Sequence, residues 1–342
     1  MRLLKYLNII RYNDWWLYKT PPLLGIFYAT LFISGKCIAD CWYEILALLF
    51  YISSAAVYVC VINDITDRKI DLKVGKSNLF LQLNKLQVNI LLFSTIALQV
   101  IVVFLLKKHG YSALWYSASI VSYSLYSIPP IRLKEKTYFG VFADAFGAHC
   151  FASIFIVIYA YSIINIKPNL LWEISIFIWS LTYGLRGIIW HQYMDREADT
   201  IVGLKTIVHS VSVSNLKLSA FIIFIVEAIG FAGMIYCISS IVLPITLLIY
   251  IIIALIRQRI YTTKIILAIV DNTFYQIFLA EFYELFMPLS ILILGFSLCK
   301  SVEFVFIFQI ILFPKRIKVL YKEFKDYYYR LLNCIKINSL FK

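Results

Sequence analysis

Long apolar runs dominate this chain and constrain its fold more than any other feature. A helix needs about 20 such residues to cross a hydrocarbon core, and runs of this kind lie at 15–35, 42–62, 87–106, 111–129, 139–163, 169–190, 217–238 and 240–256. A longer apolar stretch, 282–313, is interrupted by Lys300 and Glu303. Hydrophobic residues make up 62% of the sequence and charged residues only 15%, too few charges to cover a soluble core. The sequence therefore predicts an all-α, polytopic transmembrane bundle of about nine helices.

Basic residues gather in alternate loops, at 63–86, 130–138, 191–216 and 257–264, whereas the connections between them carry little charge. The positive-inside rule places these loops and the N-terminus in the cytoplasm. The net charge of +13 is then a mark of topology, and we expect no nucleic-acid partner. Nine spans would leave the basic C-terminus outside, so either 282–313 returns as a broken pair or 265–281 crosses the membrane. We interpret 265–281 as an interfacial or half-buried helix.

The domain organisation expected is one transmembrane domain over residues 1–313 and a separate C-terminal tail over 314–342. The tail has apolar and aromatic residues at helical spacing with eight Lys and Arg residues. This pattern predicts a basic amphipathic helix on the membrane surface, with packing against the bundle as the alternative. The seven cysteines are odd in number and contain no CxxC, which argues against a disulfide framework or a zinc site.

An acidic cluster follows the second apolar run, in the sequence Asn63-Asp64-Ile-Thr-Asp67-Arg-Lys-Ile-Asp71. On a helix the three aspartates fall at i, i+3 and i+7 and share one face. Like charges at this spacing repel one another, and a bound cation would relieve the repulsion. One such cluster alone is usually a solvated loop, so a second observation is needed.

A second cluster, Asp195 and Asp199, ends the sixth run at i, i+4 spacing. Four spans separate the two clusters, so both face the same compartment. Carboxylate oxygens suit Mg²⁺, which commonly joins one or two of them to a substrate phosphate. We predict that the metal ligands are Asp64, Asp67, Asp71, Asp195 and Asp199, and that all of these except Asp64 are catalytic.

These residues resemble the motifs of the UbiA superfamily of intramembrane prenyltransferases. The first family motif, NDxxDxxxD, matches 63–71 in full, and the second, DxxxD with a following glycine and Lys-Thr, is similar to 195–206. Between them, Tyr126-Ser-Ile-Pro-Pro-Ile-Arg132-Leu-Lys134 is similar to an aromatic-Pro-Pro-basic segment of the family. The chain lacks the arginine that often precedes the first motif, and of the Asn-Arg-Pro that often follows it the chain keeps the Asn, as Asn78, but not the Arg or Pro. It therefore resembles a divergent branch.

The resemblance implies a bundle around a central cavity in which Mg²⁺ and the diphosphate of an isoprenoid donor are held by the aspartates. An acceptor, often an aromatic ring, then attacks the allylic cation; its identity here is unknown. The substrate-binding residues carried over are Asn63, Tyr126, Arg132, Lys134 and Lys205. Membrane lipid is the other partner expected, with the motifs on the cytoplasmic face.

Ionisable residues within the apolar runs are costly there and indicate function; they include Asp144, His149, Arg186 and Glu227. Arg186 lies shortly before the second motif, so we predict that it binds substrate, with an ion pair to Asp144 as the alternative. We expect His149 to make an interhelical hydrogen bond rather than bind metal, and we assign Glu227 no role.

The function expected is Mg²⁺-dependent transfer of a prenyl group within the membrane, catalysed by a prenyltransferase. A UbiA-type terpene cyclase or a polyprenyl-phosphate phosphoribosyltransferase would use the same motifs. A cation transporter is a less favoured alternative, because a transporter needs acidic groups at successive depths of a pathway.

Overall fold

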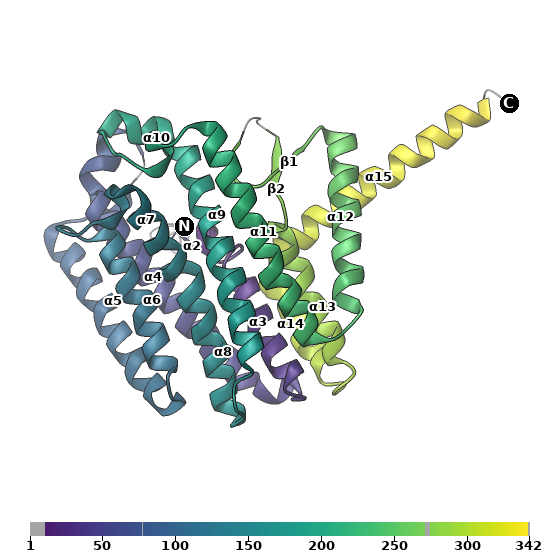
Figure 1. Cartoon of the computed structure of the whole chain (residues 1–342), viewed down its shortest axis with the longest axis horizontal. Helices are drawn as coiled ribbons and strands as arrows, with labels where there is room; N and C mark the ends of the chain where they lie inside the picture. Colours follow the sequence, from purple (N-terminus) through teal and green to yellow (C-terminus); the bar gives the residue numbers. More distant parts are fainter. Residues whose placement is uncertain (1–10, 77, 271–273, 341–342) are drawn as a thin grey trace.

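The computed structural model describes residues 11–76, 78–270 and 274–340, which form a bundle of helices running up and down (Figure 1). Five helical stretches are long and apolar enough to cross a membrane: Ile38–Lys73, Lys85–His109, Thr137–Ile164, Val213–Ile238 and Val242–Tyr261. The all-α membrane architecture predicted from the apolar runs is thus confirmed.

The principal helices follow the predicted runs closely, and short elements connect them. The principal helices are α3 (Thr20–Ile33), α4 (Trp42–Lys73), α5 (Lys85–Leu106), α6 (Ser112–Ser127), α7 (Thr137–Ala145), α8 (Phe151–Ile164), α9 (Leu170–Val202), α11 (Val213–Ile238) and α12 (Val242–Tyr261). The short elements before residue 262 are α2 (Tyr12–Trp15), η1 (Ile38–Cys41), η2 (Leu79–Gln82), η3 (Lys107–His109), η4 (Leu133–Glu135), η5 (Phe146–Cys150) and α10 (Ile207–Ser210).

Helices α3 and α5 illustrate the two environments of the bundle. α3 is apolar on all sides, and every residue from Thr20 to Leu31 is buried, as expected for a helix surrounded by others. Most of α5 is exposed, including Phe93 and Phe104. Because exposed apolar surface of this extent is compatible with lipid but not with water, α5 lies at the periphery of the bundle.

Helices α4 and α9 continue well beyond their apolar runs. α4 remains helical to Lys73, so the whole first acidic cluster is on a helix. α9 extends to Val202 and ends at Gly203, whose φ of +73° is the left-handed conformation that glycine adopts at a helix C-terminus. The polar ends of both helices lie at the same end of the bundle.

The C-terminal region differs from expectation at 265–281, which is not a helix. It contains β1 (Lys264–Ile266) and β2 (Tyr275–Ile277), paired in parallel. Just after β2, the Phe278 N–H donates to the Ile266 carbonyl of β1 at 2.8 Å. Three-residue strands are too short to produce a readable periodicity.

The apolar stretch 282–313 returns toward the motif end as a broken pair. It comprises the π-helix η6 (Phe282–Phe286), α13 (Met287–Gly295) and α14 (Val302–Leu312). α15 (Pro314–Leu340) then projects from the bundle (Figure 1). Its Glu323 accepts hydrogen bonds from Arg257 of α12 at 2.7 and 3.0 Å. The predicted tail helix therefore exists and is anchored to α12, whereas its location on the membrane surface stays a prediction.

Cys37 and Cys299 form a disulfide, which the sequence pattern, read as an argument against a disulfide framework, did not predict. Cys37 precedes η1 and Cys299 precedes α14, 262 residues later in the chain. Both lie at the end of the bundle opposite the acidic clusters. Such a long-range pairing depends on the arrangement of α3, α4 and α13 and leaves no mark in the local sequence.

A buried ion pair joins α9 and α11. The Arg186 guanidinium donates to both Glu227 carboxylate oxygens, at 2.6 and 2.7 Å, and both residues are buried. It also donates to the carbonyls of Leu267 and Phe278, which fixes the two strands against α9. The alternative pairing of Arg186 with Asp144 was wrong, and Glu227, which had no assigned role, is its partner.

We expect Glu227→Ala to destabilise the protein strongly, because it leaves the buried Arg186 charge uncompensated. Breaking a buried pair in this way costs about 3–5 kcal/mol. Thermal unfolding of the purified variant in detergent, followed by size-exclusion chromatography, measures the effect. Glu303→Ala, at an exposed position of α14, is the matched control; an equal loss in both variants would contradict a special role for the pair.

Candidate active site

A single large cavity brings the two acidic clusters together. Its volume is about 1620 Å³, and its lining includes residues near the C-terminal ends of α4 and α9. The lining includes every motif aspartate and most of the other predicted site residues: Asn63, Asp64, Asp67, Asp71, Tyr126, Arg132, Lys134, Arg186, Asp195 and Asp199. Residues separated by more than a hundred positions in the sequence thus share one site.

Asp67 is the centre of a charge cluster formed by two chain segments, α4 and the segment after α6. Arg132 donates to its carboxylate at 2.7 Å, and Lys134 contacts the same oxygen. Lys134 also donates to the side chain of Asn63 at 3.3 Å. Burial lowers the pKa of the Lys134 ammonium below its usual range, while the charge of Asp67 opposes this shift. The basic segment after α6 is therefore packed directly against the first motif.

Arg132 reaches Asp67 from an unusual backbone conformation. Its φ and ψ are +36° and +63°, in the left-handed region that residues other than glycine rarely adopt. Such conformations cost about 1–3 kcal/mol and cluster at functional sites. The surrounding contacts hold the residue there, and the result is a guanidinium directed at the motif.

The remaining aspartates also have polar neighbours. Arg11 lies 3.5 Å from the Asp64 carboxylate, and the Asn78 amide donates to the Asp71 side chain and the Asp64 carbonyl, each at 2.8 Å. Asn78 further caps η2 by accepting from the Phe80 N–H at 3.0 Å. It therefore fixes the loop after α4 against the motif.

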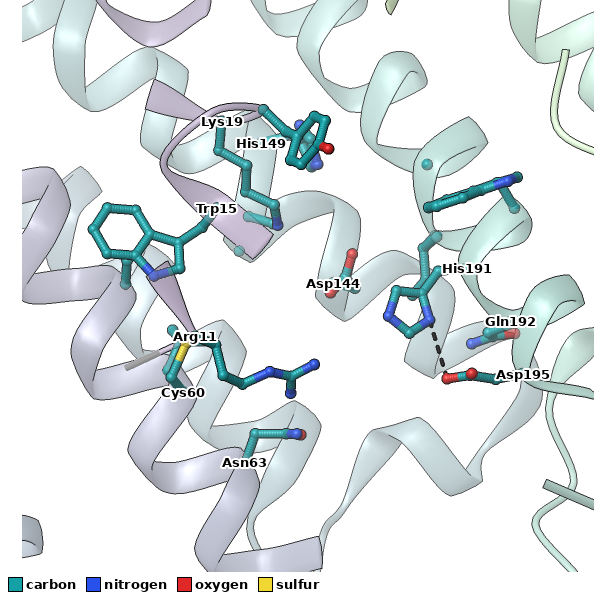
Figure 2. A pocket seen from close by; sticks show the side chains of 18 of the residues that line it. Arg11, Trp15, Lys19, Cys60, Asn63, Asp144, His149, His191, Gln192 and Asp195 are labelled. Atoms are coloured by element: carbon teal, nitrogen blue, oxygen red, sulfur yellow. Dashed lines mark ion pairs between the residues drawn. The ribbon is translucent and has the colours of Figure 1, made fainter. Parts of the chain in front are cut away.

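Lys76 links the segment after the first motif to Asp195 of the second, and His191 contacts the same aspartate from within α9. The Lys76 ammonium, from the loop after α4, is 3.1 Å from one Asp195 oxygen. His191 is 3.4 Å from the other; Figure 2 shows this imidazole and Asp195 side by side. The end of α4 and the end of α9 are thus linked by a direct charge contact.

Two predicted substrate-binding residues are placed differently from the rest. Lys205 is exposed in the loop after α9 and is not among the residues that line the cavity. Arg186 lines the cavity, but its guanidinium is already bonded to Glu227 and two carbonyls. Their contact with substrate stays a prediction. Arg11, Lys19 and Asn78 were not predicted as site residues, because their partners lie on other helices.

The donor set fits magnesium held together with a phosphate group. All the motif donors are oxygens, as a hard cation requires. Within the described residues no three His, Cys, Asp or Glu side chains converge on one point, so the protein offers separate carboxylates rather than a complete cage. Magnesium usually takes one or two carboxylates plus substrate oxygens and water, and the site meets that requirement.

The negative charges of the aspartates and the positive charges of the nearby Lys and Arg side chains almost cancel around the site. Five aspartates face Arg11, Lys76, Arg132 and Lys134. A bound divalent cation would occupy carboxylates and release these ammonium and guanidinium groups for an anion. The arrangement can therefore bind a metal ion and a polyphosphate together more readily than either alone.

Magnesium with inorganic diphosphate should stabilise the protein against thermal unfolding, by about 2.7 kcal/mol at a hundredfold excess over Kd. We expect Asp199→Asn to lose most of this stabilisation, because it removes a predicted metal ligand. Glu197→Gln, an exposed position on the same helix, should retain it. Equal stabilisation of both variants, measured by differential scanning fluorimetry, would contradict the assignment of Asp199.

Comparison with known proteins gives consistent results. The model of the UbiA prenyltransferase family matches residues 23–265. A UbiA homolog from Archaeoglobus fulgidus is similar in structure, with a TM-score of 0.57 at 17% identity over 86% of this chain and 98% of that one. Structures of that homolog bound to DMAPP and Mg²⁺ (TM-score 0.55, 16% identity, 86% and 98% covered) and to GPP and Mg²⁺ (0.54, 17%, 86% and 99%) also match. No curated protein matches the sequence.

Proposed function

This chain belongs to the UbiA prenyltransferase family, and from that premise we propose that it transfers a prenyl group from an isoprenoid diphosphate to an acceptor within the membrane. The observation that carries the proposal is the convergence of both aspartate motifs and four cationic side chains on one cavity. The similar Archaeoglobus fulgidus structures bound to DMAPP or GPP with Mg²⁺ support the donor class and the metal.

The motif aspartates would hold magnesium, directly or through water. When bound, the metal neutralises diphosphate charge and makes this group a better leaving group. Asp67 is the aspartate that both Arg132 and Lys134 contact, so metal binding there would turn both cations toward phosphate oxygens. Lys76, released from Asp195, would serve the same purpose on the α9 side.

Cleavage breaks the bond between the first prenyl carbon and the diphosphate oxygen, and the electron pair leaves with the diphosphate. The allylic cation that remains needs an environment free of competing nucleophiles. Tyr123 and Tyr126 of α6 line the cavity, and aromatic faces stabilise cations by about 0.5–2 kcal/mol. These rings would hold the cation until the acceptor attacks.

Asp67→Ala and Asp195→Ala should each reduce turnover by at least about 10²-fold, the effect of removing one group that stabilises developing charge. The assay is Mg²⁺-dependent release of diphosphate and formation of prenylated lipid from labelled geranyl diphosphate. Both variants should still insert into membranes, and Glu197→Ala should keep its activity. Normal turnover in either aspartate variant would contradict the proposed site, whereas release that needs no acceptor would favour a cyclase.

We also propose that the motifs face the cytoplasm. The basic loops lie at the motif end of the bundle, as the positive-inside rule requires for a cytoplasmic face. The Cys37–Cys299 disulfide lies at the opposite end, and disulfides persist in oxidising compartments outside the cytosol. The two arguments are independent and agree on the orientation.

Cysteine labelling tests this orientation. Lys167→Cys and Lys205→Cys place single thiols in the exposed loops before and after α9, with the five cysteines outside the disulfide replaced by serine. On intact cells, a membrane-impermeant maleimide should label position 167 at once and position 205 only after permeabilisation. The reverse pattern would place the motifs outside.

A further inference from the structure

A second polar region lines the cavity beyond the aspartate motifs. It consists of Lys19, just before α3, Asp144 on α7 and His149 on the π-helix η5. In Figure 2 the side chains of Lys19, Asp144 and His191 point into the same open space. Proteins use π-helical turns of the η5 kind frequently at functional sites.

This region begins next to the second motif and extends deeper into the bundle. Lys19 and His191 lie close enough to Asp144 to act on it electrostatically, and His191 in turn contacts Asp195. His149 is packed against Gly184 of α9, and Gly184 precedes Asp195 by eleven residues, which is about 16 Å along the helix. The polar groups therefore follow the cavity from the motif inward.

The facing wall of the cavity is apolar. Along α4, the lining residues that precede Asn63 include Ile52, Ala55, Ala56 and Val59. A prenyl chain whose diphosphate is held at the motifs would lie against this wall, because the side chains of Ile52, Ala55, Ala56 and Val59 are apolar. The opposite wall, with Asp144 and His149, remains for the other reactant.

Asp144 and His149 make no hydrogen bond or ion pair with the part of the chain that the structure describes. The His149 ring contacts the Tyr183 ring edge-to-face, with centroids 5.4 Å apart. Among the described residues, the hydrogen bond of the Lys19 ammonium goes to the Tyr123 hydroxyl, at 3.3 Å. Polar groups left unbonded at membrane depth are costly and mark ligand sites. Their donors and acceptors are available to a molecule in the cavity.

We propose that Lys19, Asp144 and His149 form the acceptor subsite and that it takes an uncharged acceptor carrying a hydroxyl group; this rests on the proposed prenyl transfer. The charges of Lys19 and Asp144 cancel, and imidazole is largely neutral near pH 7. A carboxylate brought into this region would lack a compensating charge, whereas a hydroxyl can donate to Asp144 and accept from Lys19 or His149.

Asp144 is the proton acceptor of the reaction. The hydroxyl oxygen forms a bond to the first carbon of the allylic cation, after the bond between that carbon and the diphosphate oxygen has broken. The electron pair of the broken bond leaves with the diphosphate, and the hydroxyl proton passes to the Asp144 carboxylate. His149 is a positioning residue that orients the acceptor from its far side.

A matched pair of phenols tests the acceptor class. The purified protein is given geranyl diphosphate and Mg²⁺ with either 4-methylphenol or 4-hydroxybenzoate, which differ in a methyl against a carboxylate. We expect 4-methylphenol to be prenylated at least tenfold faster. Preference for 4-hydroxybenzoate, or diphosphate release that yields only geraniol with both phenols, overturns the proposal. Absence of any Mg²⁺-dependent release refutes the proposed function itself.

Variants at the acceptor subsite test the roles of Asp144 and His149 through the ratio of prenylated phenol to geraniol and through KM. Asp144→Asn should shift the product from prenylated 4-methylphenol toward geraniol by about 10²-fold, the usual contribution of a general base. In Gly184→Ala the added Cβ would come within 3.0 Å of the His149 side chain. We therefore expect this substitution to raise the KM for the phenol more than it raises the KM for geranyl diphosphate. Asp40→Asn, at the opposite end of the bundle, is the control. An unchanged product ratio in Asp144→Asn, or an equal fall in release and transfer, overturns the role of Asp144.

Discussion

Charges buried among apolar helices must be neutralised by charges from other segments, and both the stability of this bundle and its site depend on that requirement. Arg186 and Glu227 pair across α9 and α11, and Arg257 pairs with Glu281 between α12 and the segment before η6. The unpaired alternative would cost several kcal/mol per charge. Each pair therefore fixes which helices are neighbours.

The same requirement makes the site responsive to ligands. Asp67 is neutralised by two cations that reach it from the segment after α6. Those contacts stabilise the empty cavity, yet they consist of groups that magnesium and diphosphate each bind well. Ligand binding can exchange partners without leaving a charge uncompensated, which allows a polyanion to enter a bundle made mostly of apolar residues.

Sequence reasoning succeeded where the information was local. The i, i+3, i+7 spacing of Asp64, Asp67 and Asp71 predicted one helical face, and α4 does extend through all three. Sequence reasoning failed where a residue pairs with another that is distant in the chain. Glu227 and Cys299 showed no local signal because the partner of each lies tens or hundreds of residues away. The short strands at 264–277 were missed since three residues define no period.

The sequence alone determined that the chain is a helical membrane protein with two acidic helix ends on one side, because hydrophobic length and helical spacing are properties of consecutive residues. Only the tertiary structure decided that these ends share a cavity with Arg132 and Lys134, and that Asp144 and His149 face it. Side chains meet according to how helices pack and rotate against one another, and this depends on the whole bundle rather than on any single segment.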